Sequence, residues 1–226
     1  MKTHDHLTPS MQAILMLYNK GYTLHVTFQT IREKLPSLDA KWSEDFGIRL
    51  PAHTRYQRKL KGFANAVALA GPMIALPTMV QPILMATPEA LCMPLASAWA
   101  RQQWVDRYPC FSNYRMTKEN RANGEVALTW RLQDEELEKF RKYLVMLAQS
   151  ANGQEIARVT ADAVRFHPMF GGVRRQLRRT FREIERLWRH LHKTPYPGWN
   201  PEALPTMIGF KTEGASTTSA CRKRQE

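Results

Sequence analysis

The stretch VRRQLRRTFREIERLWRHLHK, residues 173–193, has the pattern of an amphipathic helix whose polar half is almost entirely arginine. At about 100° per residue, its apolar side chains share one side and its cations share an arc of about 140° on the other. The apolar side consists of Val173, Leu177, Phe181, Ile184, Leu187, Trp188 and Leu191, and the basic arc of Arg174, Arg175, Arg178, Arg179, Arg182, Arg186, Arg189 and Lys193. The pattern predicts a helix that packs on a core and presents cations outward.

The basic arc carries far more positive charge than a solvated helix needs. The helix holds only two acids, Glu183 and Glu185, and the chain has 33 Lys and Arg against 20 Asp and Glu, a formal net charge of +13 over 226 residues. Guanidinium groups bind phosphates through paired hydrogen bonds and stack on bases. We therefore expect this helix to bind nucleic acid. The alternative is that its arginines pair with acids elsewhere in the fold.

The segments before this helix predict alternating strands and helices. EVALTWRL, residues 125–132, alternates like a strand, and a helix over 135–149 follows with Asp134 as its cap. The next segment, IARVTADAVRF at 156–166, is interpreted as a strand or hairpin, and residues 206–210 as a last short strand. With the arginine helix between them, this order predicts an α+β protein built on the ferredoxin-like, split βαβ plan.

The first half of the sequence also predicts a strand-helix-strand unit. A helix is expected over 9–19 with Thr8 as its N-cap, then a half-buried strand over 22–30. A helix over 38–46 and a brief strand at 48–50 complete it. We expect four portions along the chain: an N-terminal helix (1–20), a first strand-helix-strand portion with a basic loop and a Met- and Pro-rich segment (21–120), a second ferredoxin-like portion (121–211) and a disordered basic tail (212–226).

A second basic segment, HTRYQRKLKGF at 53–63, contains no acid and places aromatic residues between its cations. Such a loop suits RNA with unpaired bases, which stack on aromatic rings while cations neutralise the phosphates. The alternative is a solvated linker. The candidate contacts here are Arg55, Tyr56, Arg58, Lys59 and Lys61.

The plan, the charge and the segment RRQLRRTFR at 174–182 together resemble the ferredoxin-like RNA-binding proteins of CRISPR systems. In particular, they resemble the subunits that bind or cut the repeat hairpin of the guide-RNA precursor. The resemblance covers most of residues 21–210. In some members an arginine-rich helix lies along the phosphates of the hairpin's major groove, and residues 174–182 would be the matching element. The resemblance implies binding of structured RNA and, in some members, its cleavage without a metal.

Cleavage of this kind uses the neighbouring 2′-hydroxyl as nucleophile and needs a base to accept its proton. The candidate bases are His25 in the first strand, His53 beside the basic loop and His167 before the arginine helix. A lone histidine is more often structural than catalytic. All three are therefore named only as candidates for the base. No acidic or histidine cluster has metal-ligand spacing, and we expect neither a metal nor another cofactor.

Three functions remain open from the sequence. The first is a protein that binds structured RNA, with or without processing of a guide RNA, and the second is a DNA-binding regulator or accessory protein of a mobile element. The third is a non-enzymatic scaffold that binds an acidic protein, or that serves as a subunit of a ribonucleoprotein complex, with its basic helix in the interface. DNA reading is disfavoured because Gln176, at the edge of the arc, is the one amide available to read bases. We expect a cytoplasmic protein without membrane contact. Reversal of Arg175, Arg179 and Arg182 to Glu is expected to abolish binding and to leave the fold intact.

Overall fold

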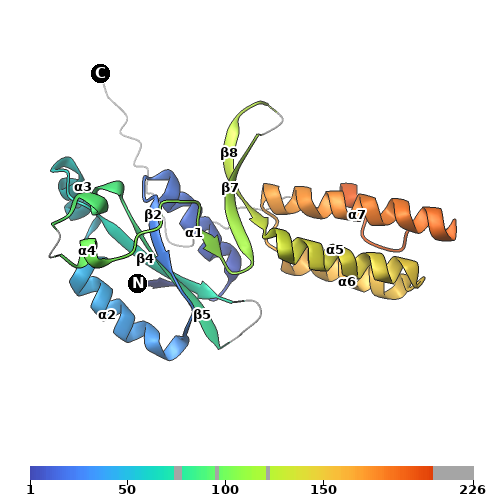
Figure 1. The fold of residues 1–226 in the computed structure, drawn as a ribbon, viewed down its shortest axis with the longest axis horizontal. Coiled ribbons are helices and arrows are strands. Elements are labelled where there is room, and N and C mark those ends of the chain that lie inside the picture. Colours follow the sequence, from blue (N-terminus) through green and yellow to red (C-terminus); the bar gives the residue numbers. More distant parts are fainter. Residues whose placement is uncertain (74–77, 95–96, 121–122, 206–226) are drawn as a thin grey trace, which may run out of the picture.

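The computed structural model describes residues 1–73, 78–94, 97–120 and 123–205, and it confirms an α+β protein (Figure 1). The helices are α1 (Leu7–Asn19), α2 (Leu35–Phe46), α3 (Ala52–Leu60), α4 (Ala98–Arg101), α5 (Asp134–Gln149), α6 (Gly153–Phe166) and α7 (Gly171–His192). The strands are β1 (Lys2–Thr3), β2 (Leu24–Thr27), β3 (Thr30–Ile31), β4 (Ala66–Pro72), β5 (Met79–Ala86), β6 (Cys110–Phe111), β7 (Tyr114–Asn120) and β8 (Val126–Leu132). Short 3₁₀ turns lie at Arg32–Lys34, Pro88–Cys92 and Pro201–Ala203.

The first sheet has the strand order β1-β4-β5-β2, with β3 paired to the other end of β5. β1 runs parallel to β4, with Lys2 opposite Leu69, and the remaining pairs are antiparallel. One face of this sheet packs on α1 and the other on α2 and α4. The α2 face is lined by small side chains of β4, Ala66 and Ala68, because bulky rings of Trp42, Phe46 and Trp99 fill the space above them.

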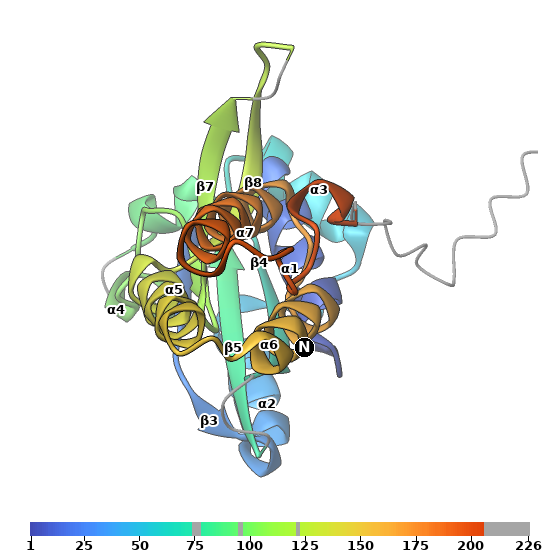
Figure 2. The same cartoon turned by 90° about the vertical axis from the view of Figure 1, so that its right-hand side faces the viewer.

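The second sheet, β6-β7-β8, is an antiparallel meander that joins the first sheet to the helices α5, α6 and α7. Tyr114 and Trp130 at its base are fully buried, and the Trp130 Nε1–H donates to the Met11 carbonyl of α1 at 3.0 Å. The far end of the β7–β8 hairpin projects away from the body (Figures 1 and 2). One hydrophobic core therefore runs from the first sheet, through the hairpin base, into the helical bundle.

The expected strand or hairpin at 156–166 is wrong, because these residues form helix α6. The Asn152 side chain accepts from the Glu155 N–H and caps the helix, while Ile156, Thr160 and Ala163 are buried at helical spacing. The second half thus runs from three strands into three helices. The finer expectation of split βαβ units is not confirmed, and the first sheet has the order given above.

The basic loop at 53–63 is also a correction, since most of it is helix α3. Arg, Gln, Lys and Leu are good helix formers, and the segment holds neither glycine nor proline between Pro51 and Gly62. The brief strand at 48–50 is wrong, because these residues form a turn after Gly47, which ends α2 in the left-handed conformation as expected. The N-cap position of α1 is His6 and not Thr8.

The expected strand over 22–30 is divided into β2 and β3, and its alternation breaks because Leu24 and His25 are both buried. Other expectations are confirmed within a few residues, namely the helices at 9–19, 38–46 and 135–149 and the strand at 125–132. Asp134 lies within α5, and Gln133 occupies its N-cap position. The expected strand at 206–210 and the tail at 212–226 lie outside the described residues.

Candidate nucleic-acid interface

Helix α7, which contains the arginine arc, is held tightly against strand β8 at its first turn. The Gly172 N–H donates to the Thr129 hydroxyl at 3.0 Å. A Cβ at Gly172 would lie 2.4 Å from the Trp130 carbonyl oxygen, so only glycine allows this approach. One turn later, Gln176 accepts from the Leu132 N–H at 2.8 Å and donates to the Leu132 carbonyl at 3.1 Å. Gln176 therefore satisfies the free edge of β8, is buried, and is not available to read bases.

The apolar side of α7 packs as the sequence predicts over most of its length, but Leu191 near its end is 45% exposed. Val173, Leu177, Phe181 and Ile184 are fully buried in the main core, and Trp188 is 6% exposed. The helix consequently has a fixed rotation about its axis. The basic arc faces outward as one side of the bundle.

The alternative in which the arginines pair with acids is correct for half of the basic arc. Ion pairs join Arg175 to Glu119, Arg178 and Arg182 to Glu202, and Arg189 to Glu185. The pairs with Glu119 and Glu202 tie α7 to the β7–β8 hairpin and to the turn at Pro201–Ala203, whereas the Arg189–Glu185 pair lies within α7. The expected harmless reversal of Arg175, Arg179 and Arg182 is therefore not a clean test, because two of those three side chains hold neighbouring elements.

Four cations of the arc, Arg174, Arg179, Arg186 and Lys193, form no ion pair with any residue that the structure describes. Arg179, Arg186 and Lys193 are exposed. Arg179 and Arg186 lie on one side of α7, about 10 Å apart along its axis, and Lys193 ends the helix in the left-handed conformation. We call these three residues the cation row.

Glu183 interacts chiefly with a residue of another helix and only secondarily with Arg179 of the row. Its carboxylate accepts from the Arg141 Nε–H of α5 at 2.9 Å, and this bond lowers the pKa of Glu183. The acid is thus held ionised by a partner on another helix. Arg141 is the main partner of this acid, and Arg179 of the row also interacts with it electrostatically.

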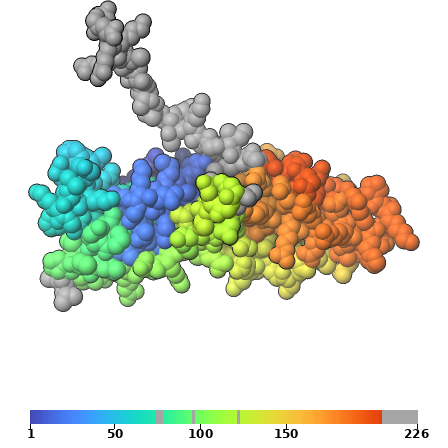
Figure 3. Space-filling model, turned by 90° about the horizontal axis from the view of Figure 1, so that it is seen from above, coloured from blue at the N-terminus to red at the C-terminus, as the bar shows by residue number. Residues whose placement is uncertain are grey.

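Helix α3, the second basic segment, lies far from α7. Figures 1 and 3 place the two helices at opposite ends of the long axis. Arg58 donates to the Ala64 carbonyl at 2.9 Å and lies over the Phe63 ring, so it stabilises the end of its own helix. Tyr56 is 59% exposed, and Lys59 and Lys61 are exposed beside it. Arg55 is half-buried. The two basic segments do not form one continuous surface.

The three candidate catalytic histidines are not brought together. His25 is 4% exposed on β2, and burial lowers its pKa to about 4. The His167 Nδ1 lies 2.6 Å from the Tyr114 hydroxyl, and burial lowers the pKa of His167 and raises that of Tyr114. His53 is exposed at the start of α3, where its Nε2 lies 3.1 Å from the Thr54 hydroxyl. His25 and His53 belong to β2 and α3, and His167 precedes α7, so none of the three is part of the cation row.

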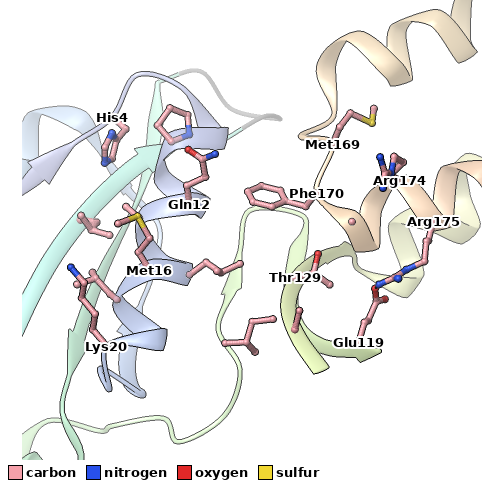
Figure 4. A pocket seen from close by; sticks show the side chains of 18 of the residues that line it. His4, Gln12, Met16, Lys20, Glu119, Thr129, Met169, Phe170, Arg174 and Arg175 are labelled. Atoms are coloured by element: carbon pink, nitrogen blue, oxygen red, sulfur yellow. The ribbon is translucent and has the colours of Figure 1, made fainter. Parts of the chain in front are cut away.

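A groove between α1 and the start of α7 was not expected from the sequence (Figure 4). It has a volume of about 1080 Å³, and α1 turns Gln12, Met16 and Lys20 toward it from one row of the helix. From α7, Arg174 and Arg178 line the opposite wall. The available signal was the spacing of four residues between Gln12, Met16 and Lys20, which marks one side of a helix but not what lies across from it.

In the described part of the chain, no group of three or more His, Cys, Asp or Glu is placed to hold a metal ion. No described helix has both the length and the apolar character needed to cross a membrane. Comparison with protein-family models, with curated proteins and with solved structures finds no match to this chain. Its function therefore has to be argued from the surfaces themselves.

Proposed function

We propose that this protein binds nucleic acid, with structured RNA preferred over DNA, through the cation row of α7. The observation that carries the proposal is that Arg179, Arg186 and Lys193 are exposed and form no ion pair with a described residue, while their neighbours on the helix are paired. Cations spread along α7 and at its C-terminal end match an extended polyanion better than a single small anion.

Several properties support nucleic acid as that polyanion. The formal net charge of +13 attracts phosphate backbones over long distances. Two of the three row residues are arginines, whose planar heads bind phosphate through two parallel hydrogen bonds. The row sits on a helix fixed by core packing on its other side, so little conformational entropy beyond that of the side chains is lost on binding.

The preference for RNA follows from what the row lacks. Sequence reading in the DNA major groove uses amides and hydroxyls beside the arginines, and Gln176 is committed to Leu132. Contacts by cations alone position a backbone and do not specify bases. Recognition by backbone shape is typical of folded RNA. A CRISPR repeat hairpin is the specific ligand that we propose to test first, and we propose a binding subunit of a ribonucleoprotein without a cleavage step assigned to it.

The test is binding of the purified protein to a labelled RNA hairpin, a single-stranded RNA and a DNA duplex across a range of salt concentrations. Replacing Arg179, Arg186 and Lys193 together by Gln removes up to three phosphate contacts. The slope of log K against log salt is then expected to become about 2 to 3 less steep. The same samples run on a denaturing gel report any cut strand.

A matched control removes three exposed cations elsewhere, with Lys34, Lys41 and Arg165 replaced by Gln. It changes the net charge equally and is expected to change the salt slope by less than the row variant. Equal slopes for the two variants would show that net charge, and not the row, accounts for binding. Weak, salt-insensitive binding of the native protein to all three nucleic acids would overturn the proposed function.

A further inference from the structure

The groove between α1 and α7 combines an apolar floor with charged walls. Val67 and Leu69 of β4, Leu128 of β8 and Phe170 before α7 line it, and Met16 stands in it with 55% of its surface exposed (Figure 4). An exposed methionine beside aliphatic side chains forms an adaptable apolar surface. An occupant of this groove therefore needs an apolar side.

Cations stand on both walls of the groove. Lys2 and Lys20 belong to the wall formed by β1 and the end of α1, and Arg174 and Arg178 to the wall formed by α7. The acid that lines the groove, Glu119, is paired with Arg175. An occupant therefore meets positive charge on two opposite sides of its apolar contact, which favours an elongated molecule with acidic flanks.

We propose that this groove binds an amphipathic acidic helix of a partner protein. The volume of about 1080 Å³ is at the upper limit of small-molecule sites, and a compact anion would reach only one of the two charged walls. Single-stranded nucleic acid fits less well, because the two rings that line the groove offer little surface for base stacking: Phe170 is only 5% exposed and His4 is half-buried. Helices recognised in grooves insert apolar residues at spacings of three and four between aliphatic walls. This inference concerns a surface distinct from the cation row.

The probe is a fluorescein-labelled helical peptide of about five turns, with Leu along one stripe and Glu on the remaining sides. One control peptide carries Lys in place of Glu, and another keeps the composition but scatters the Leu residues. Fluorescence anisotropy with the full chain measures binding. The acidic amphipathic peptide is expected to bind at least about tenfold more tightly than either control. Similar binding of all three, or no binding of the acidic peptide, would overturn the proposal.

Met16→Glu places a carboxylate in the groove, and Met146→Glu is its matched control, because Met146 is 52% exposed on α5 outside the groove. The first is expected to weaken acidic-peptide binding about tenfold and the second to leave it unchanged. Lys20→Glu, at an exposed position, gives a second test through charge alone.

RNA binding is measured with the same variants. The proposal expects both methionine variants to bind the RNA hairpin as the native protein does, whether or not the cation row accounts for that binding. If Met16→Glu instead weakened RNA binding and spared the peptide, the groove would belong to nucleic acid and the proposal would be overturned.

Discussion

The burial of His25 predicts how much unfolding free energy the protein loses at acidic pH. Its pKa falls from 6.5 to about 4 in the folded protein, chiefly through burial, with Arg107 lowering it further and Asp106 raising it. Between pH 4 and pH 6.5 the unfolded chain binds more protons at this site than the folded protein does. The stability that the buried, neutral His25 contributes is therefore fully present above pH 6.5 and is lost as the pH falls toward 4. A gap of that size corresponds to about 3 kcal/mol in total, and to about 2 kcal/mol between pH 8 and pH 5.

The measurement compares urea unfolding of the native protein with that of His25→Leu and His25→Gln at pH 8 and pH 5. The variants have no group to titrate at this position, so each is expected to lose about 2 kcal/mol less on acidification, whatever its stability at pH 8. His4 and His167, whose pKa values are also lowered, act equally in all three proteins and cancel in the comparison. Equal losses in native and variant proteins would refute the reasoning and would reopen His25 as an accessible base.

Two further predictions concern the contact between α7 and β8. Gly172→Ala forces a methyl group against the Trp130 carbonyl and is expected to cost about 3 kcal/mol of unfolding free energy, while Gly171→Ala, with its nearest neighbour at 3.7 Å, is expected to be nearly neutral. Equal urea midpoints for the two variants would show that Gly172 does not lie this close to the Trp130 carbonyl. Gln176→Leu leaves the N–H and carbonyl of Leu132 unpaired and is expected to cost about 2 kcal/mol, and an unchanged midpoint would show that the amide contributes nothing to stability.

The elements that the sequence predicted correctly are those with a periodic pattern and a clear stop. The arginine helix has apolar residues on one side only, and the helix ending at Phe46 is followed by a glycine in the left-handed conformation. The expected strand at 156–166 is wrong because a short segment rich in Ile, Val and Ala fits a strand as well as a helix at that length. The Asn152 side chain, which caps the N-terminus of α6, is the local feature that favours the helix.

The candidate site was only partly accessible from the sequence. The composition of the basic arc was visible, but its division into paired and unpaired arginines was not. Glu119 and Glu202 are distant in sequence from α7, and folding alone brings them to it. The groove depends in the same way on the packing of α1 beside β8. Local patterns set which side chains a helix presents outward, and tertiary contacts set which of them remain free.

This division changes what the charge of α7 implies for binding. If all eight cations of the arc met phosphates, the salt slope would be about 6 to 7, whereas the cation row alone supports about 2 to 3. An ion pair on the surface is weak, about 1 kcal/mol or less, so a phosphate could displace an acid from Arg182, which is half exposed, at little cost. The slope measured for the native protein therefore reports whether the ion pairs persist in the complex. A slope near 3 means that the paired arginines stay bound to the hairpin and the 3₁₀ turn. A slope near 7 means that these arginines bind phosphates of the ligand instead.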